Sequence, residues 1–349
     1  MLPVPAPRDQ GDRVLGVDLT RGVAIIAMVI AHVRVWSPYS SEDDLVISSV
    51  LAQVNNLASP LFALVMGISV GLVSLRPGVT PAAAIRRDVV RGLLLIATGL
   101  ALNQLGTFIA IVLQHLGVTL IVGTVLARLR LPVLTIVTAA TFLAAPLVNA
   151  AARAALPGVQ TYRGAPWEQV LEWIVLSPYY RLTNLLPFFL LGVVMAVRHF
   201  ERRLLVALLA VGATSYLAFV ALRLAGFEVQ TSGSYLDTLS DVGLAVTTAS
   251  ALILLAPHLP AAPRAILAPV VAVGTVSLSA YVFHVVLIDV LTVDDARRDS
   301  AIHWAVAGGL VLAATVGLGW VWWRVVGVGP LERLLAAVTG RLVPEGRSG

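Results

Sequence analysis

The sequence contains no cysteine and no lysine, and it is poor in charge of either sign. Without cysteine there is no disulfide, no thiol nucleophile and no thiolate metal site, and any redox compartment is compatible with the chain. Only 12% of the 349 residues are charged, whereas 58% are hydrophobic, and the mean hydropathy is +0.90. Soluble globular proteins do not have this composition. The sequence therefore predicts an integral membrane protein.

Apolar runs recur along the whole chain between short charged or Pro/Gly-containing loops. Runs of about 20 residues are long enough to cross a hydrocarbon layer of about 30 Å, so we expect an all-α, polytopic transmembrane helical bundle of about ten spans. The stretch "AQVNNLASP" is a possible break in the second span, and Gly106 and Gly117 interrupt the fourth. The expected spans are 17–36, 50–75, 89–106, 108–127, 132–152, 183–199, 204–224, 241–258, 266–290 and 303–326.

The distribution of charge orients these spans. All 24 basic residues are arginines, and most of them lie in loops that alternate with acidic loops such as "SEDD" and "DTLSD". By the positive-inside rule we expect both termini to lie in the cytoplasm. The protein itself is expected in the cytoplasmic (inner) membrane. We therefore attribute the excess of basic over acidic residues to loops that face anionic lipid, and not to binding of nucleic acid. Because Asp18 and Arg21 interrupt the first apolar run, we expect no cleavable signal peptide.

Three segments outside the spans complete a single domain over residues 1–349. Residues 1–16 are expected to be a cytoplasmic N-terminal segment. Residues 157–182 are too polar to cross, and their tryptophans predict an outer loop with a helix at the interface, where it could cover a site. Residues 329–349 predict a cytoplasmic amphipathic tail.

The first span carries Asp18, Arg21 and His32 on one stripe. At 100° per residue, Arg21 and His32 lie within about 20° of each other and about 16 Å apart along the axis, with Asp18 about 40° round the same face. An ionisable group at membrane depth costs on the order of 2.5 to 3.5 kcal/mol, so the stripe predicts a site or pathway facing the bundle interior. The alternatives are a structural Asp18–Arg21 ion pair and a buried, hydrogen-bonded His32.

A second polar stripe lies in the ninth span. Ser277, Tyr281 and His284 share one helical face at i, i+4 and i+7, which suits either acceptor binding or interhelical hydrogen bonding. Because this span runs from inside to outside, we expect His284 near the depth of His32.

Further polar residues are weaker candidates. His115, with Gln114 and Asn103, could line a cavity, although a structural role is favoured. Asn56 could add hydrogen-bond donors at the entry to the second span, with a structural role equally consistent. No histidine and carboxylate pair has the i, i+4 spacing of a buried zinc site, so we expect no metal.

These segments resemble the membrane acyltransferase superfamily, which includes the acyltransferase-3 enzymes, the heparan-α-glucosaminide N-acetyltransferases and the YeiB-like proteins. Asp-x-x-Arg-Gly followed by His32 is similar to the first helix of that superfamily, and "SPLFALVMGISVGL", "LPFFLLGVVMA" and "VGTVSLSAYVFHVVL" are similar to later motifs. "GPLERLL" at 329–335 resembles the YeiB-like branch. The heparan enzymes have asparagine at the position of His32 and their proposed catalytic histidine in the next loop, where this chain has Glu42, Asp43 and Asp44.

The resemblance implies a transfer of an acyl group, with acetyl expected, from cytosolic acyl-CoA to a hydroxyl or amine of an envelope sugar, glycolipid or small acceptor. A neutral imidazole suits the base, so His32 is the candidate. Arg21 could hold a phosphate or carbonyl of acyl-CoA, with Asp18 orienting it. The candidate substrate-binding residues are His284, Tyr281, Ser277, His115, Gln114, Asn103 and Asn56.

A transporter is the alternative function. The same cavity would move a small solute or lipid without chemistry, with the charged stripe as its pathway. The expected partners are the lipid bilayer and, for the enzyme, acyl-CoA and a glycan, glycolipid or amine acceptor. A homodimer is compatible with the sequence.

Overall fold

A computed structural model describes residues 15–34, 45–74, 79–156, 165–229, 231–292 and 301–342. These residues form helices, turns and short loops without a β-strand, which confirms the all-α prediction. Several predicted features lie outside the described residues: most of the N-terminal segment 1–16, the loop with Glu42, Asp43 and Asp44, the first part of the outer loop, and the end of the tail.

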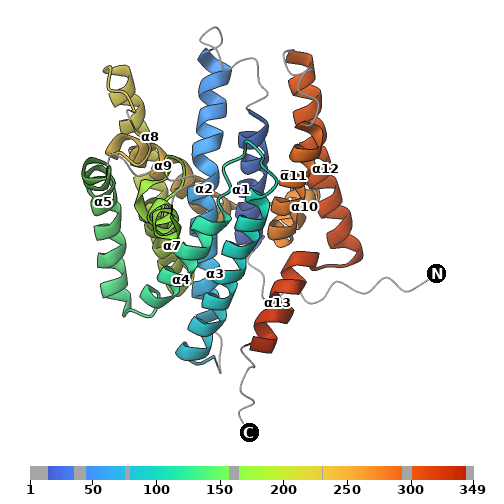
Figure 1. The fold of residues 1–349 in the computed structure, drawn as a ribbon, viewed down its shortest axis with the longest axis horizontal. Coiled ribbons are helices and arrows are strands. Elements are labelled where there is room, and N and C mark those ends of the chain that lie inside the picture. Colours follow the sequence, from blue (N-terminus) through green and yellow to red (C-terminus); the bar gives the residue numbers. More distant parts are fainter. Residues whose placement is uncertain are drawn as a thin grey trace, which may run out of the picture.

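The helices pack against one another in a bundle (Figure 1). Their bounds are α1 (Leu15–Val33), α2 (Leu45–Ser74), α3 (Pro81–Asn103), α4 (Leu113–Leu126), α5 (Leu131–Ala155), α6 (Pro166–Leu171), η4 (Glu172–Leu176), α7 (Leu182–Val197), α8 (Arg202–Leu224), α9 (Tyr235–Leu255), η5 (Ala256–His258), α10 (Ala261–Thr275), α11 (Ser277–Thr292), α12 (Ala301–Val325) and α13 (Pro330–Leu342).

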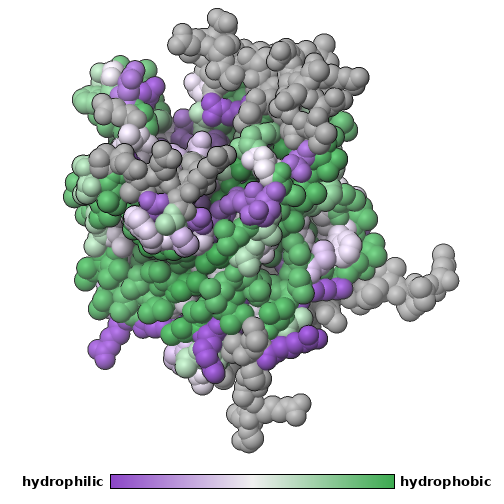
Figure 2. Space-filling model, viewed as in Figure 1, coloured by the Kyte–Doolittle hydropathy of each residue, from purple (hydrophilic) through white to green (hydrophobic). Residues whose placement is uncertain are grey.

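The protein is an integral membrane protein. Within the described residues, six helices are long and apolar enough to cross a membrane, and the bent pair α10 and α11 makes a seventh candidate. The helices α4 and α7 are apolar but shorter. Figure 2 shows hydrophobic residues as a broad band across the middle of the face in view, with hydrophilic residues above it and along its lower edge. The figure of about ten spans stays a prediction.

The helices divide into a buried centre and an exposed rim. In α1, 72% of the 18-residue apolar stretch is buried inside the protein. In α8 and in α12 only 17% of the corresponding stretch is buried. The core includes Ile25 and Met28 of α1 with Leu61 and Leu64 of α2. Apolar side chains on the rim face outward, as expected of surfaces that contact lipid. The first helix is therefore central, and its polar stripe cannot face the bilayer.

The predicted ninth span is not one continuous helix. The chain bends by 85° between α10 and α11, with Val276 at the corner. The expected span over 266–290 is therefore broken into two helices, because apolar composition does not encode a corner that neighbouring helices impose, and the crossing itself stays a prediction. By contrast α2 runs unbroken through Pro60, so the possible break in the second span does not occur.

The corner is fixed by a close contact between α10 and α1. A Cβ added at Gly22 would lie 2.0 Å from the Val270 carbonyl oxygen, and one added at Gly274 would lie 2.1 Å from the Asp18 carbonyl oxygen. Only glycine allows two backbones to approach so closely, as small residues do at helix interfaces in membranes. This contact anchors α10 on the first half of α1 and sets the point from which α11 departs.

Candidate functional site

His32 and His284 are in direct contact inside the bundle. His32 lies near the end of α1 and His284 in the middle of α11, and Nδ1 of His32 is 2.9 Å from Nε2 of His284. The two rings stack with their centroids 5.1 Å apart and an interplanar angle of 21°. The exposed fraction is 7% for His32 and 0% for His284. The structure thus brings together the two stripes predicted in the first and ninth spans.

The hydrogen-bond network assigns the tautomers of this pair. The Ala280 carbonyl oxygen lies 3.0 Å from Nδ1 of His284, and because a carbonyl can only accept, this nitrogen carries the proton. Nε2 of a neutral His284 then has a lone pair, and it accepts from the Nδ1–H of His32. Nε2 of His32 is left as a lone pair with no hydrogen-bond partner among the described residues. The chain of bonds therefore presents His32 as an unprotonated base.

Tyr281 lies edge-on to both imidazoles. Its ring centroid is 5.2 Å from that of His284 and 6.3 Å from that of His32. The backbone N–H of Val112, just before α4, donates to the Tyr281 hydroxyl at 3.3 Å. Tyr281 therefore connects the histidine pair to α4.

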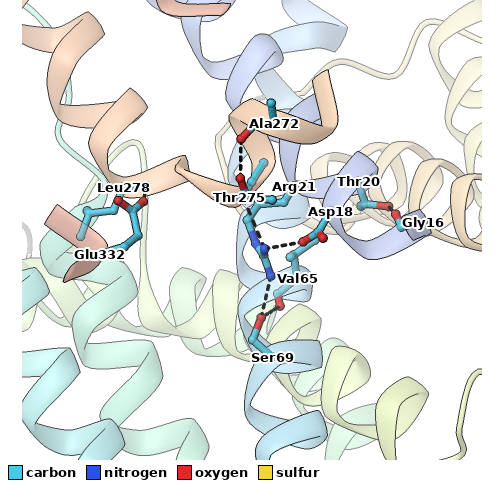
Figure 3. Close-up of polar contacts among 11 residues, drawn as sticks. Gly16, Asp18, Thr20, Arg21, Val65, Ser69, Ala272, Thr275, Leu278 and Glu332 are labelled. Carbon is cyan, nitrogen blue, oxygen red and sulfur yellow. Dashed lines mark hydrogen bonds and ion pairs between the residues drawn. The ribbon is translucent and has the colours of Figure 1, made fainter. Parts of the chain in front are cut away.

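Arg21 joins three helices (Figure 3). Its guanidinium donates to Asp18 at 2.9 Å, to the Ser69 hydroxyl at 3.0 Å and to the Gly274 carbonyl at 3.3 Å. The structural ion pair considered from the sequence is therefore present. Arg21 also ties α1 to α2 and α10, and it does not contact His32.

A cavity of about 270 Å³, which we name the arginine cavity, is bounded by Arg21 of α1 and by helices α2, α3, α4, α10, α11 and α13. Arg91 and Glu332 also line it, and so do the predicted residues Ser277 and Tyr281. Most of the remaining wall is aliphatic. His32 and His284 are not part of the wall, and Tyr281 stands between them and the cavity.

Arg91 is held at the cavity wall by a buried carboxylate. Asp88, fully buried, lies 3.9 Å from Arg91 and 3.6 Å from Arg87, and it accepts from the Thr124 hydroxyl at 3.1 Å. This cluster fastens α3 to α4 and places a second guanidinium beside the cavity.

A larger cavity of about 830 Å³, which we name the carboxylate cavity, is formed by α2, α8, α9 and the segment before α7. Glu228, Asp237 and Asp241 line it, with Arg223 as the one basic residue of the wall that the structure describes. The predicted residue Asn56 lines it as well, beside Asn55 and Ser59. Along α2, residues 49–60 face this cavity and residues 62–70 face the arginine cavity.

Arg181 lies close to the carboxylate cavity, at the start of α7. The residue is 1% exposed, and its guanidinium donates to the Ser232 hydroxyl at 2.9 Å. Burial, with a contribution from Arg153, lowers the pKa of Arg181 to about 10, while the fields of Asp237 and Asp241 act in the opposite direction. One buried positive charge thus offsets part of the negative charge of the wall.

Each cavity has a tyrosine ring in its wall. Tyr180 lines the carboxylate cavity and lies edge-on to His115, with ring centroids 5.8 Å apart. Tyr281 lines the arginine cavity. Both ring nitrogens of His115 are buried without a hydrogen-bond partner among the described residues. His115 therefore lies behind Tyr180, in contact with the wall of the carboxylate cavity, and lines neither cavity.

The other predicted residues are dispersed. Gln114 is buried beside Gly99, whereas Asn103 is exposed at the end of α3, and neither lines a cavity. Within the described part of the chain, no three His, Asp or Glu side chains are grouped as a metal site would require.

Sequence reasoning missed Arg91, Tyr180, Asp241 and Glu332. Arg91 and Glu332 were counted with the charges of loops and tail, because hydropathy cannot show that a helix end lines a cavity. Asp241 stands at the predicted start of a span and, with Asp237 four residues earlier, forms an i, i+4 carboxylate pair that was a usable signal.

Comparison with known families gives two matches. The model described as "Heparan-alpha-glucosaminide N-acetyltransferase, catalytic" matches residues 13–226, more than half of the chain. The model described as "Protein of unknown function (DUF418)" matches residues 194–341. The first match contains α1 and His32, and the second contains α11, His284 and all but the last residue of α13. No curated protein matches the chain.

Proposed function

The chain belongs to the heparan-α-glucosaminide N-acetyltransferase family of the membrane acyltransferase-like superfamily, which also contains the YeiB-like proteins, and on that premise we propose that it transfers an acyl group from cytosolic acyl-CoA to an envelope acceptor. The acyl group is expected to be acetyl. The acceptor is a hydroxyl or amine of a sugar, a glycolipid or a small molecule. The observation that carries the proposal is the buried lone pair on His32, next to Tyr281, whose ring lines the arginine cavity.

The arginine cavity is the proposed donor site, facing the cytoplasm. Arg21 and Arg91 line it, and a guanidinium binds phosphate or a polarised carbonyl through several N–H donors. About 270 Å³ is too little for a whole acyl-CoA. We therefore assign the cavity to the acyl-pantetheine arm, with the nucleotide outside.

His32 is the proposed general base. Its Nε2 would take the proton of the acceptor hydroxyl or amine as that group attacks the thioester carbonyl, and the thiolate of CoA leaves. The positive charge that His32 gains strengthens its Nδ1–H bond to His284, whose own Nδ1–H donates to Ala280. His284 thus orients His32 and stabilises its charged form.

The carboxylate cavity is the proposed acceptor site, on the outer face. Its wall offers carboxylates, amides such as Asn56, and the ring of Tyr179, which together suit a polar acceptor with hydroxyl or amine groups. Transfer requires the two substrates to meet at His32. Because Tyr281 lies between His32 and the arginine cavity, its ring must move when the donor binds.

The test uses purified protein reconstituted in vesicles, with labelled acetyl-CoA on one side and a panel of glycan and amine acceptors on the other. We expect acceptor-dependent release of CoA and labelled acceptor, both lost in His32→Ala. A protein that folds, binds both compounds and releases no CoA with any acceptor would contradict the proposal.

Transport is the second candidate function, favoured by the sharp break between α10 and α11 and by two cavities that follow one another along α2. Broken helices form the substrate sites of many secondary transporters. In the same vesicles, movement of unmodified solute across the bilayer without thioester turnover would support transport.

A further inference from the structure

Glu332, in the first turn of α13, caps a different helix. Its carboxylate accepts from the backbone N–H of Leu278 at 2.7 Å and from that of Ser279 at 3.2 Å, both in the first turn of α11. The Ser279 hydroxyl donates to the second oxygen of the same carboxylate. Figure 3 shows the side chain of Glu332 reaching the start of α11. A residue more than fifty positions away thus satisfies the N-terminus of α11.

The cap is reciprocal. The hydroxyl of Ser279 accepts from the backbone N–H of Leu331, in the first turn of α13, at 3.1 Å. The first N–H groups of any helix have no partner within the helix, and the N-terminus carries a partial positive charge. Here two N-termini face each other, and the negative charge of Glu332 lies between them. Each helix supplies the cap of the other.

Gly329 leaves the space that this arrangement needs. A Cβ at this position would lie 1.9 Å from the Glu332 carboxylate and 2.6 Å from the Ser279 hydroxyl. Pro330 begins the helix, where a missing N–H costs nothing. In an ordinary capping box a glutamate at this position reaches back to its own helix. The pattern Gly-Pro-Leu-Glu instead directs the carboxylate to α11.

The direction of α11 decides whether the histidine pair exists. This helix starts at the 85° corner, where the backbone N–H of Leu278 is capped. Tyr281 follows Leu278 by three residues and His284 follows it by six. His284 contacts His32 through one 2.9 Å hydrogen bond and through the stacking of the two rings. A displacement of about 1 Å is enough to lose such a bond and about a hundredfold in rate.

We propose that Glu332 is a positioning residue for the reaction: by capping α11 from α13 it fixes the helix that brings His284 to His32. It acts through α11 and contacts neither imidazole. The inference rests on the proposed roles of the two histidines, but the contact that it explains can be measured without any turnover.

The experiment compares wild type with Glu332→Ala, Glu332→Gln and the control Arg333→Ala, which removes an exposed neighbour on α13 whose guanidinium binds the Val326 carbonyl. Two quantities are measured in detergent: the N–H···N coupling between His32 and His284 by ¹⁵N-histidine NMR, and kcat and KM for acetyl transfer. Thermal unfolding reports whether each variant is folded.

In Glu332→Ala we expect the coupling to disappear and kcat to fall about a hundredfold, with KM for the acceptor unchanged. Glu332→Gln keeps one oxygen acceptor for the two N–H groups, so it should retain most of the coupling and most of the wild-type kcat. Arg333→Ala should match wild type in both quantities. If Glu332→Ala does not fold, Ser279→Ala, which removes the shared hydroxyl alone, should give an intermediate loss of both.

A folded Glu332→Ala that retains the coupling and kcat would overturn the inference. If wild type transfers no acyl group, the proposed function fails, and the coupling then decides the positioning role by itself. Persistence of the coupling in Ser279→Ala and Glu332→Ala would refute it in that case as well.

Discussion

The imidazoles of His32 and His284 meet across 252 residues of sequence, with Nδ1 of the first 2.9 Å from Nε2 of the second. The bond links the central helix α1 to α11, which reaches it only after a sharp corner. Because the Ala280 carbonyl fixes one end of this chain of bonds, the free lone pair falls on His32.

The first prediction concerns this pair as a unit. We expect His32→Ala to lower kcat by about 10²- to 10⁴-fold, the range of general base catalysis, and His284→Ala to lower it nearly as far. The double variant should lose little more, since both changes remove one function. The exposed His258 provides the control, and His258→Ala should keep wild-type kcat. Losses that multiply in the double variant would mean that the two histidines act separately.

The second prediction separates the two arginines. Arg91→Ala should raise KM for acyl-CoA about tenfold, equivalent to about 1.4 kcal/mol, and it should destabilise the fold less than Arg21→Ala does, because Arg87 and Thr124 still contact the buried Asp88. Arg21→Ala should raise the same KM and also destabilise the fold by about 1 to 2 kcal/mol, because it removes bonds to Ser69 and Gly274. Both KM values and thermal midpoints are measured, with Arg264→Ala as the control. If Arg21→Ala weakens donor and acceptor binding equally, Arg21 is structural.

The third prediction tests the contact between α1 and α10. Gly22→Ala should destabilise the protein by about 1 to 3 kcal/mol, because the new methyl group collides with the Val270 carbonyl. Gly309→Ala in α12 is the matched control: nothing lies within 4 Å of its added Cβ, and a helical glycine replaced by alanine gains roughly 0.5 to 1 kcal/mol. Equal thermal midpoints for the two variants would argue against the close contact.

The fourth prediction is a pH dependence of stability from Glu172, which lies in η4 between α6 and α7. Burial raises the pKa of this carboxyl from 4.5 to about 7. Between these values the folded protein holds a proton that the unfolded chain has released, so stability falls as pH rises through this window. In thermal unfolding at pH 5.5 and 8.5, Glu172→Gln should remove this part of the decline. An unchanged difference between the two pH values would disprove the assignment.

The sequence predicted where the helices lie along the chain better than it predicted how the chain turns between them. Nine of the ten predicted spans fall on one helix each, and five of them agree with it within three residues at both ends, because apolar runs and charged loops are local signals. The corner at Val276 was not predictable in this way, since it depends on Gly274 meeting the backbone of α1. The role of Glu332 was hidden for the same reason: the carboxylate and the N–H groups that it caps belong to different helices.

For this protein the sequence alone determined that the chain is an all-α membrane protein with an ionisable stripe on its first helix, because composition and 3.6-residue periodicity need no partner to be read. Only the tertiary structure decided that His32 meets His284, that Arg21 joins α1 to α2 and α10, and that one cavity is lined by two arginines and the other by three carboxylates. The contacts between helices depend on the corner at Val276, on the caps and on close backbone contacts. These join residues that are far apart in the chain, so they exist only when the helices are packed together.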